Sequence, residues 1–406
     1  MKFLFLSDVG FDNPISGSEQ VLYQQINGLS KKNHSISAIT RENGNSFKSG
    51  IRQNNGILNA YYSIDLNHRY RVFLTLLKEP PKLFNNYIDK GQLAAVISHQ
   101  PFTYFSLIIN GRMRGVPLIY VFHSPNHEEY MLSNIRLYYL AGIFLSQLRR
   151  KIEQFCLKKA SRILVLSQFM KQKIIDLHQI PSDRIIVNPG GVDLDRFKPI
   201  ASREMLKKDL GYRENCMHLL TIRNLEPRMG LDNLLKSIKI LKEKIAKIHL
   251  TLGGEGPEKE NLNKLIKRFG LMDNVTMTGF IPAEQLPKFY AAADLFILPT
   301  RELEGFGLVT PESMACGTPV VGTPVGGTKE ILSNFDYNFL CRESSPAAIA
   351  DAIQKIIKIY FNNRKIYKNL RMRCREHVKT NYSWQRHINQ LDSIINEMLG
   401  SRHAKS

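Results

Sequence analysis

Short apolar runs rich in Val, Ile, Leu and Phe alternate along the chain with longer stretches in which apolar residues recur at helical spacing. The runs have the length of buried parallel strands, and the stretches between them can form crossover helices. The N-terminal half contains KFLFLS (2–7), HSISAIT (34–40), AAVISHQ (94–100), PLIYVFHS (117–124) and SRILVLS (161–167). The C-terminal half contains HLLTIR (218–223), KIHLTLGG (247–254), NVTMTG (274–279), LFILPT (295–300) and TPVVGT (318–323). This alternation predicts an α/β protein with parallel sheets.

The same plan occurs twice, which predicts two Rossmann-like domains over residues 1–199 and 200–382. An irregular, Pro-containing stretch around residues 192–202 would join them. After Tyr382 the sequence SWQRHINQLDSIINEML has apolar residues at helical spacing, and no strand follows it. We therefore expect residues 383–406 to form a helix and tail that pack back toward the N-terminal domain. Trp384, the only tryptophan, would be a packing anchor.

Composition removes several classes of protein. With 406 residues and 43% hydrophobic content the chain can bury a large core, so it is not a disordered protein. The first apolar run stops at Asp8, too early for a signal peptide. The run LYYLAGIFLSQL (137–148) is well below the roughly 20 residues that span a bilayer, so we expect no transmembrane helix. Five cysteines without metal-ligand spacing fit reduced thiols in a cytoplasm.

The formal charge of +20 is unevenly distributed. Between Met131 and Ile175 nine Lys or Arg residues face one acid, Glu153. Apolar residues are interleaved with them, namely Leu137, Tyr138, Tyr139, Leu140, Ile143, Phe144 and Leu145. Two interpretations stay open: a helix lying on an anionic membrane surface, or a solvated helix face over a core stripe. For a second basic run, Lys355 to Lys379, the solvated face is favoured.

The segment RELEGFGLVTPESMACGTPVV (301–321) places Glu304 and Glu312 on either side of a Gly-Phe-Gly loop. Glu304 follows the strand LFILPT, and doubly wound domains bind ligands at the carboxyl ends of their strands. Glycines let a ligand approach the backbone closely, and the N-terminus of the following helix favours anions. A nucleotide sugar, with hydroxyl groups on both sides of a diphosphate, suits this arrangement. Carboxylates that merely cap the helix would explain the pair equally well.

EGFGLVTPESMACGTPVV closely resembles the two-glutamate motif of the family 4 retaining glycosyltransferases. Other stretches are similar to that family in the same order: ISGSEQVLYQQINGLSKKNHSISAIT (15–40), ILVLSQFMKQKIIDLHQIPSDRIIVNPGGVDLDRFKP (163–199), LLTIRNLEPRMGLDNLL (219–235), GGEGPE (253–258) and VTMTGFIPAEQLPKFYAAADLFILPT (275–300). Each match alone is weak, but the series covers nearly the whole chain. The resemblance implies the GT-B fold, in which two Rossmann-like domains with parallel sheets face each other across a central cleft.

The resemblance also implies how a donor diphosphate would be bound. Gly17 would let the first loop touch the diphosphate, with Ser16 beside it; a structural turn is the alternative for this glycine. Arg223, at a strand end, would pair with the diphosphate and stabilise the charge of the leaving group. The family commonly has a lysine six residues after this arginine, where this chain has Met229. Either Arg228 supplies the second cation or the site binds the diphosphate with less positive charge, and we expect the first.

For the rest of the donor, the resemblance implies that Glu312 binds the ribose hydroxyls and that the backbone at Phe280 and Ile281 contacts the nucleobase. Glu304 would hold the transferred sugar and phosphates. It would act together with the backbone N–H groups of Gly305, Phe306, Gly307, Leu308 and Val309.

Two histidines follow strands of the first domain. His123 ends the strand PLIYVFHS and matches a family histidine close to the donor sugar, so we expect a catalytic role. His99, in AAVISHQ, is comparable by position alone, and a structural role is favoured for it.

The predicted activity is therefore retaining transfer of a hexose-type sugar from a nucleotide diphosphate sugar to a hydroxyl acceptor. The acceptor would be lipid-linked or a cell-surface glycan made in polysaccharide biosynthesis, with segments such as residues 67–90, interpreted as a loop, helping to select it. No Asp-x-Asp element stands out at a strand end, so we expect no metal and no cofactor. The predicted location is cytoplasmic, peripheral at the inner face of the membrane. The alternatives are a GT-B nucleotide-sugar epimerase or a transferase for a soluble acceptor; no nucleic-acid-binding module is recognised.

Overall fold

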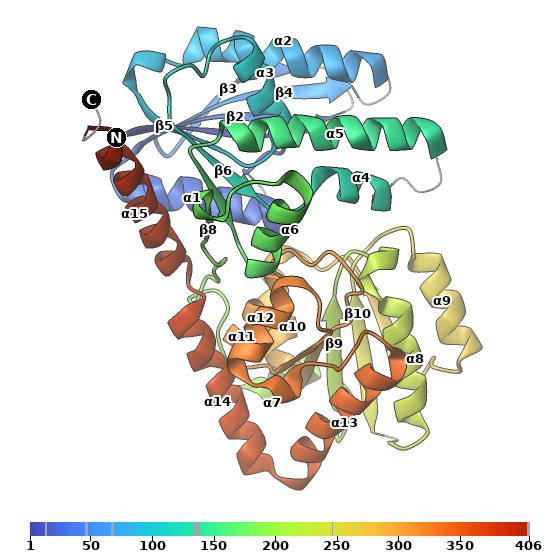
Figure 1. Ribbon diagram of the computed structural model, residues 1–406. Helices are drawn as coiled ribbons and strands as arrows, with labels where there is room; N and C mark the ends of the chain where they lie inside the picture. The colour runs from blue at the N-terminus through green and yellow to red at the C-terminus, as the bar shows by residue number, and fades with distance from the viewer. Residues whose placement is uncertain (13, 45–47, 66–68, 134–138, 246, 404–406) are drawn as a thin grey trace. The chain divides into compact units, whose positions relative to one another are not determined.

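The computed structural model describes residues 1–406 except 13, 45–47, 66–68, 134–138, 246 and 404–406 (Figure 1). The chain divides into two compact units. Unit 1 comprises Met1–Pro189 together with Trp384–Ser406, and unit 2 comprises Gly190–Ser383. The first boundary thus lies before the predicted position at residue 199. The joining stretch belongs to unit 2, because Val192 forms a bridge with Ser383.

Unit 1 is built on an eight-stranded sheet in the order β3-β4-β2-β1-β5-β6-β7-β8. In chain order the strands are β1 (Lys2–Ser7), β2 (Ser35–Gly44), β3 (Ser49–Asn54), β4 (Ile57–Asp65), β5 (Leu93–Ser98), β6 (Leu118–Phe122), β7 (Arg162–Val165) and β8 (Ile185–Val187). Among the strands that the structure describes in this unit, only β3 and β4 pair in antiparallel fashion. The chain leaves β1 toward β2 on one side and later adds β5 on the other, which makes the carboxyl ends of β1 and β5 a topological switch point.

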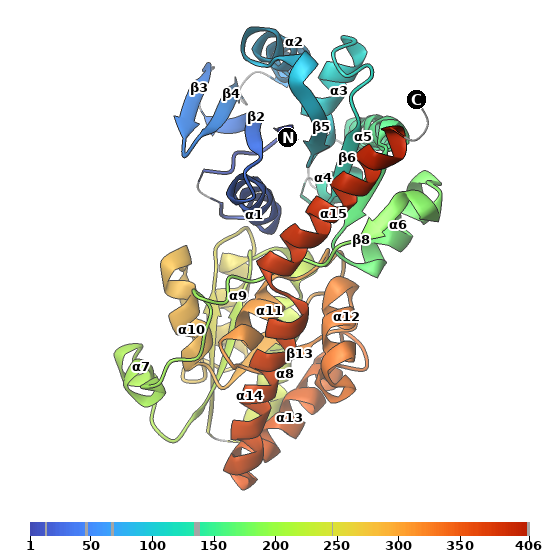
Figure 2. The same cartoon turned by 90° about the vertical axis from the view of Figure 1, so that its left-hand side faces the viewer.

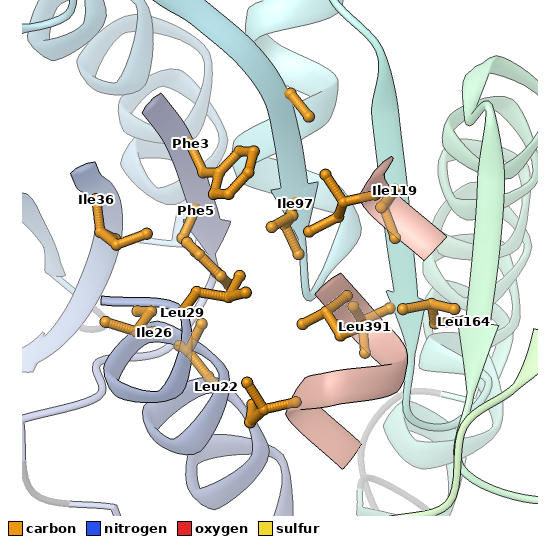
Figure 3. Close-up of a cluster of buried hydrophobic side chains, with 14 of the residues drawn as sticks. Phe3, Phe5, Leu22, Ile26, Leu29, Ile36, Ile97, Ile119, Leu164 and Leu391 are labelled. Atoms are coloured by element: carbon orange, nitrogen blue, oxygen red, sulfur yellow. The ribbon is translucent and has the colours of Figure 1, made fainter. Parts of the chain in front are cut away.

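The helices of unit 1 are α1 (Gly17–Lys31), α2 (Arg69–Tyr87), α3 (Pro101–Ile109), α4 (Asn126–Ser133), α5 (Tyr139–Lys159), α6 (Gln168–His178) and α15 (Trp384–His403). Helix α15, red in Figure 2, is the predicted terminal helix and belongs to unit 1. Its Leu391 joins Phe3 and Phe5 of β1 and Leu22 of α1 in one buried cluster (Figure 3). A Cβ atom at Gly28 would lie 2.5 Å from Cγ1 of Ile388, so this glycine lets α1 and α15 pack closely. Trp384 is buried, as expected.

Unit 2 contains a parallel five-stranded sheet in the order β11-β10-β9-β12-β13. Its strands are β9 (Met217–Ile222), β10 (Ile248–Gly253), β11 (Val275–Gly279), β12 (Leu295–Leu298) and β13 (Val320–Gly322). Its helices are α7 (Arg203–Asp209), α8 (Leu231–Lys242), α9 (Lys259–Arg268), α10 (Leu286–Ala292), α11 (Val309–Ala315), α12 (Gly326–Phe335), α13 (Pro346–Asn362) and α14 (Arg364–Asn381). The strand order reverses between β9 and β12, so the switch point of this unit lies at their carboxyl ends.

All ten predicted strands occur, and the structure adds β3, β4 and β8. The interpretation of residues 67–90 as a loop is wrong, because α2 covers Arg69–Tyr87; residues 67 and 68 lie outside the described part of the chain. Leu76, Pro80, Leu83 and Phe84 are buried at helical spacing, so this apolar stripe outweighs the two prolines inside the helix.

Several side chains of the second basic run serve packing within unit 2. Arg371 donates to the carbonyl oxygens of Ala293 (3.1 Å) and Ala291 (3.2 Å). The Arg364 guanidinium carbon lies 3.8 Å from the centroid of the Tyr360 ring. Within the described residues, no helix is both long and apolar enough to pass through a membrane.

Candidate functional site

The switch point of unit 2 brings Arg223 and Glu304 together. Arg223 follows the last residue of β9, and Glu304 stands in the loop after β12. Arg223 Nη2 donates to Glu304 Oε2 over 2.6 Å, and the Thr300 hydroxyl donates to the same oxygen over 3.0 Å. Each side chain of the ion pair is only 9% exposed. A charged pair this well buried is positioned with little freedom, and the described residues make no bond to Glu304 Oε1.

Arg223 makes one further contact and has one unpaired donor. Its Nη2 also lies 2.8 Å from the Met229 sulfur, so the position where the family commonly has lysine contacts this arginine. Its Nε is buried and has no hydrogen-bond partner among the described residues. An unpaired buried donor costs on the order of 1–3 kcal/mol, which an anionic oxygen would recover. An acceptor such as an anionic oxygen would satisfy this group.

Two hydrogen bonds within unit 2 hold the Arg228 side chain. Its Nε donates to Glu226 Oε2 over 3.0 Å, and its Nη1 donates to the Leu303 carbonyl over 3.0 Å. Leu303 has φ of +57°, a left-handed conformation that is rare for such a residue. Arg228 thus fixes the strained turn immediately before Glu304, and Glu226 balances its charge. Its role as second cation stays a prediction.

The Gly-Phe-Gly loop rests on the beginning of α12. Gly307 has φ of +80°, and a Cβ atom there would lie 2.6 Å from the Thr328 hydroxyl. At Gly326, which also has positive φ, a Cβ atom would lie 1.8 Å from the Glu304 carbonyl oxygen. Neither position can accept a side chain without displacing the loop. Phe306 is buried, while Gly305, Leu308 and Val309 are partly exposed at the start of α11.

Glu312 lies on α11 and accepts a hydrogen bond from the Tyr290 hydroxyl of α10 over 3.1 Å. Burial raises the pKa of Glu312 to about 7, and the bond from Tyr290 opposes that rise. Burial also raises the pKa of Tyr290 well above its usual value; Glu312 adds to the rise, and the charge of Arg223 opposes it. Tyr290 is therefore influenced by both Glu312 and Arg223.

Phe280 and Ile281 directly follow β11. Phe280 is 59% exposed, whereas Ile281 is buried. A Cβ atom at Gly253, the last residue of β10, would lie 2.5 Å from Ile281 Cδ1. Both residues therefore lie at the same carboxyl edge of the sheet as Arg223, with an aromatic ring open to solvent.

In unit 1 the structure gives Ser16 a capping role. Its hydroxyl accepts from the Glu19 N–H (3.3 Å), and the Glu19 carboxylate accepts from the backbone N–H groups of Ser16 (2.9 Å) and Ile15 (2.7 Å). This is a capping box at the start of α1, where Gly17 is the first helical residue and is exposed. The spacing of Ser16 and Glu19 would have predicted it from the sequence alone.

His123 and His99 follow β6 and β5 of unit 1 and are hydrogen-bonded to each other. His99 Nδ1 lies 3.0 Å from His123 Nε2, and His99 Nε2 lies 3.1 Å from the Gln25 side-chain oxygen. Gln25 Nε2 in turn lies 3.0 Å from Nε2 of His387 on α15. Desolvation on burial lowers the pKa of His123 to about 4.

Sequence reasoning missed Thr300, Tyr290, Gln25 and His387. Thr300 stands two residues after the end of β12, and this position near a strand end was the available signal. Nothing in the local sequence distinguishes the other three from ordinary helix residues. Within the described ranges, no group of three or more His, Cys, Asp or Glu side chains is arranged to hold a metal ion.

Comparison with protein families assigns both halves of the chain. Residues 15–196 match the model described as Glycosyltransferase Family 4, and residues 202–379 match the model described as Glycosyl transferases group 1. The fold is shared with sucrose-phosphate synthase from Thermosynechococcus elongatus, with a TM-score of 0.80 over 99% of this chain and 100% of that chain, at 20% identity. The two family matches together cover both sheets except for β1.

Two curated relatives illustrate the sequence similarity. The chain is 33% identical over 178 residues to a GDP-mannose-dependent alpha-(1-6)-phosphatidylinositol monomannoside mannosyltransferase of Mycobacterium tuberculosis (strain CDC 1551 / Oshkosh), a match that covers 42% of this chain and 46% of that protein. It is 24% identical over 394 residues to a phosphatidylinositol N-acetylglucosaminyltransferase component of Arabidopsis thaliana, which covers 95% of this chain and 79% of that one. The first match thus spans about half the length of the relative.

Proposed function

The chain belongs to the family 4 glycosyltransferases of the GT-B type, and we propose from this premise that it transfers a hexose-type sugar from a nucleoside diphosphate donor to a hydroxyl group. The observation that carries the proposal is the arginine at the switch point of unit 2. Arg223 is buried, fixed by Glu304, and still has an Nε donor without a partner among the described residues. A diphosphate oxygen supplies the acceptor that this donor lacks.

The two glutamates would bind different parts of the nucleotide sugar. Glu304 uses Oε2 for Arg223 and Thr300, so Oε1 is the oxygen that would accept from a hydroxyl of the transferred sugar. Glu312 would accept from the ribose hydroxyls, with its other bond to Tyr290 holding the carboxylate in place. The exposed Phe280 ring lies at the same sheet edge and would meet the nucleobase.

The proposed reaction retains the configuration of the anomeric carbon. The bond from this carbon to the diphosphate oxygen breaks, and the bond to the acceptor oxygen forms on the same face. The acceptor proton passes to the departing diphosphate oxygen, so no residue needs to become a covalent nucleophile. Arg223 stabilises the charge that develops on the leaving group, in place of a metal ion. His123 of unit 1 would contact a hydroxyl of the transferred sugar.

We further propose that the acceptor is lipid-linked or membrane-proximal and that α5 contacts the membrane. Phe144, Leu145, Leu148 and Phe155 of α5 are 69%, 41%, 36% and 37% exposed. Lys151, Lys158 and Lys159 of the same helix are also exposed. Phe144, Leu148, Lys151, Phe155 and Lys158 recur at helical spacing and form one apolar and basic stripe. Such a stripe suits an anionic lipid surface.

Two arginines of the expected basic surface bind other residues of unit 1. Arg149 donates to the Asn126 side chain over 2.9 Å and lies over the ring of Tyr130, and Arg150 donates to the Leu177 carbonyl. These two arginines stabilise unit 1 itself, so the membrane proposal rests on the exposed lysines of α5. The predicted residues Arg136, Leu137 and Tyr138 lie outside the described residues. The two curated relatives carry phosphatidylinositol in their names, which supports a lipid-linked acceptor.

The donor can be identified by thermal shift. UDP-, GDP- and ADP-sugars are added in turn, and the donor at 100 times its Kd should add roughly 2.7 kcal/mol to the free energy of unfolding. Analysis of the products formed without any acceptor then separates a transferase from an epimerase. A nucleotide sugar that is epimerised without an acceptor would contradict the transferase proposal.

A further inference from the structure

A continuous series of hydrogen bonds leads from His123 into unit 1, and we call this series the histidine chain. It consists of His123, His99, Gln25 and His387, and it ends on the backbone carbonyl of Pro189. The successive distances are 3.0, 3.1, 3.0 and 2.8 Å. Its members come from the ends of β6 and β5, from α1 and from α15, so four separate elements must pack correctly to form it.

The interior of the histidine chain excludes water. Gln25 is fully buried, and His99 and His387 are each 2% exposed. Desolvation on burial lowers the pKa of His387 to about 4 and that of His99 well below its usual value. The rings are therefore neutral at pH 7, and each neutral imidazole donates from one nitrogen and accepts at the other.

The Pro189 carbonyl, at the end of the histidine chain, determines the direction of every hydrogen bond in it. The Pro189 oxygen can only accept, so His387 carries its proton on Nδ1 and accepts at Nε2 from the Gln25 amide group. The Gln25 oxygen then accepts from His99 Nε2–H. His99 in turn accepts at Nδ1, which requires that His123 donate from Nε2.

The reverse direction is disfavoured. If the Gln25 amide were turned round, its oxygen would face His387 Nε2, and His387 would have to donate from both nitrogens. That form of the ring is positively charged, and burial disfavours a charge at this position. The opposite tautomer of His123 therefore needs a charge that this interior does not favour.

We propose that His387, through Gln25 and His99, is a positioning residue that holds His123 in the Nε2–H tautomer and leaves Nδ1 as a hydrogen-bond acceptor. His123 then accepts from a hydroxyl group of its ligand and cannot donate to a phosphate or carbonyl oxygen from that nitrogen. This use of the acceptor rests on the proposed transferase function, whereas the tautomer itself does not. The C-terminal helix α15 thereby sets the chemistry of a residue that stands more than half the chain away in sequence.

The tautomers can be measured directly by NMR on the full-length protein labelled with 15N. Two-bond 1H–15N correlations of the rings distinguish the two neutral forms, and single substitutions assign the signals. We expect His387 as the Nδ1–H form and His99 and His123 as the Nε2–H form. His123 in the Nδ1–H form, or a doubly protonated His387 at pH 7, overturns the inference. The tautomers themselves are read from the wild-type protein, and the substitutions serve only to assign its signals.

Two variants of His387 separate positioning from packing. His387→Gln keeps an oxygen that can accept from Gln25, whereas His387→Phe fills the space without any acceptor. We expect His123 to stay in the Nε2–H form in the Gln variant and to become a mixture of both tautomers in the Phe variant. The same single tautomer in both variants overturns the assignment of His387.

Activity gives a second readout. With the donor identified, His387→Phe should lower kcat by roughly fivefold to tenfold, the loss of about one uncharged hydrogen bond, while KM for the donor changes little. His387→Gln should largely restore kcat. An equal loss of kcat in both variants contradicts the positioning role. If NMR shows the expected tautomers but the protein has no transferase activity, the proposed function is overturned and the inference about the ring nitrogens is supported.

Discussion

Arg223 Nη2 and Glu304 Oε2 lie 2.6 Å apart at the point where the strand order of unit 2 reverses. The two residues are 81 positions apart in sequence, and each follows a different strand of the sheet. An isolated buried ion pair contributes little net stability, because desolvation offsets the attraction between the charges. The pair is better explained by what it orients: the free donors of Arg223 and the second oxygen of Glu304.

Replacement of Glu312 by alanine should weaken donor binding by about 1.5 to 3 kcal/mol, the range of hydrogen bonds to a charged group. The reason is that the carboxylate, held by Tyr290, would accept from the ribose hydroxyls. Isothermal titration with the identified donor measures the change. Glu330→Ala, on α12 of the same unit, is the matched control. Equal donor affinity of a folded Glu312→Ala protein and the wild type would refute the assignment.

The pH dependence of stability should report on Glu312. Burial raises the pKa of this group from 4.5 to about 7 in the folded protein. Between these two values the native state retains a proton that the unfolded chain has released, so stability falls as pH rises through this window and is level above it. Urea denaturation from about pH 5 to pH 8 should therefore show a smaller decline for Glu312→Gln than for wild type. Parallel curves for the two proteins would contradict the raised pKa.

Turnover should survive removal of divalent metal ions. The proposed charge stabilisation comes from Arg223, which the protein supplies itself, so EDTA should leave the rate of sugar transfer essentially unchanged. The assay compares initial rates with EDTA, without it, and after addition of magnesium or manganese. Complete loss of activity that either metal restores would show that the reaction depends on a metal site.

The α5 stripe should bind anionic vesicles. Each basic side chain near such a surface adds about 1 kcal/mol, and 1 M salt should weaken the attraction because the screening length falls to about 3 Å. In liposome flotation, Lys151, Lys158 and Lys159 changed together to Gln should reduce binding, as should Phe144→Ser. The control is a second triple substitution to Gln that removes the same charge from α14, at the exposed residues Lys365, Lys368 and Lys379. Wild-type protein that stays unbound at low salt would exclude the membrane proposal and favour a soluble acceptor.

Much of the fold could be predicted because parallel strands buried on both faces leave a strong apolar signal. Elements that depend on turn chemistry were missed. The β3–β4 hairpin turns at Asn55 and Gly56, both with positive φ. Asn-Gly is a strong hairpin signal, but a search for apolar runs does not detect it. Residues 67–90 were interpreted as a loop, but α2 contains Pro80 and Pro81 within the helix, and the buried stripe that stabilises it could be recognised only from the packing.

Only some residues of the candidate site could be predicted from the sequence. Arg223, Glu304 and His123 follow strands, and this position together with the resemblance to the family made them candidates. The partners that give them their properties lie far away in sequence: Gln25 and His387 are 362 residues apart, and Tyr290 reaches Glu312 from another helix. Arg228 shows the same limit. It neighbours Met229 in sequence, yet its guanidinium donates to the Leu303 carbonyl, because the left-handed turn at Leu303 exists only in the folded unit.

The most direct test of the account is the affinity of Arg223 variants for the donor, measured by isothermal titration. Arg223→Gln alone would leave Glu304 buried without its partner, so Arg223→Gln is combined with Glu304→Gln and compared with Glu304→Gln alone. Arg301→Gln, an exposed arginine bonded to Asp232, is the control for loss of charge. We predict that loss of Arg223 weakens donor binding roughly 10-fold to 100-fold, the equivalent of a charge-assisted hydrogen bond, while Arg301→Gln binds like wild type. Equal donor affinity with and without Arg223, in proteins that keep their cooperative thermal transitions, would contradict the central claim.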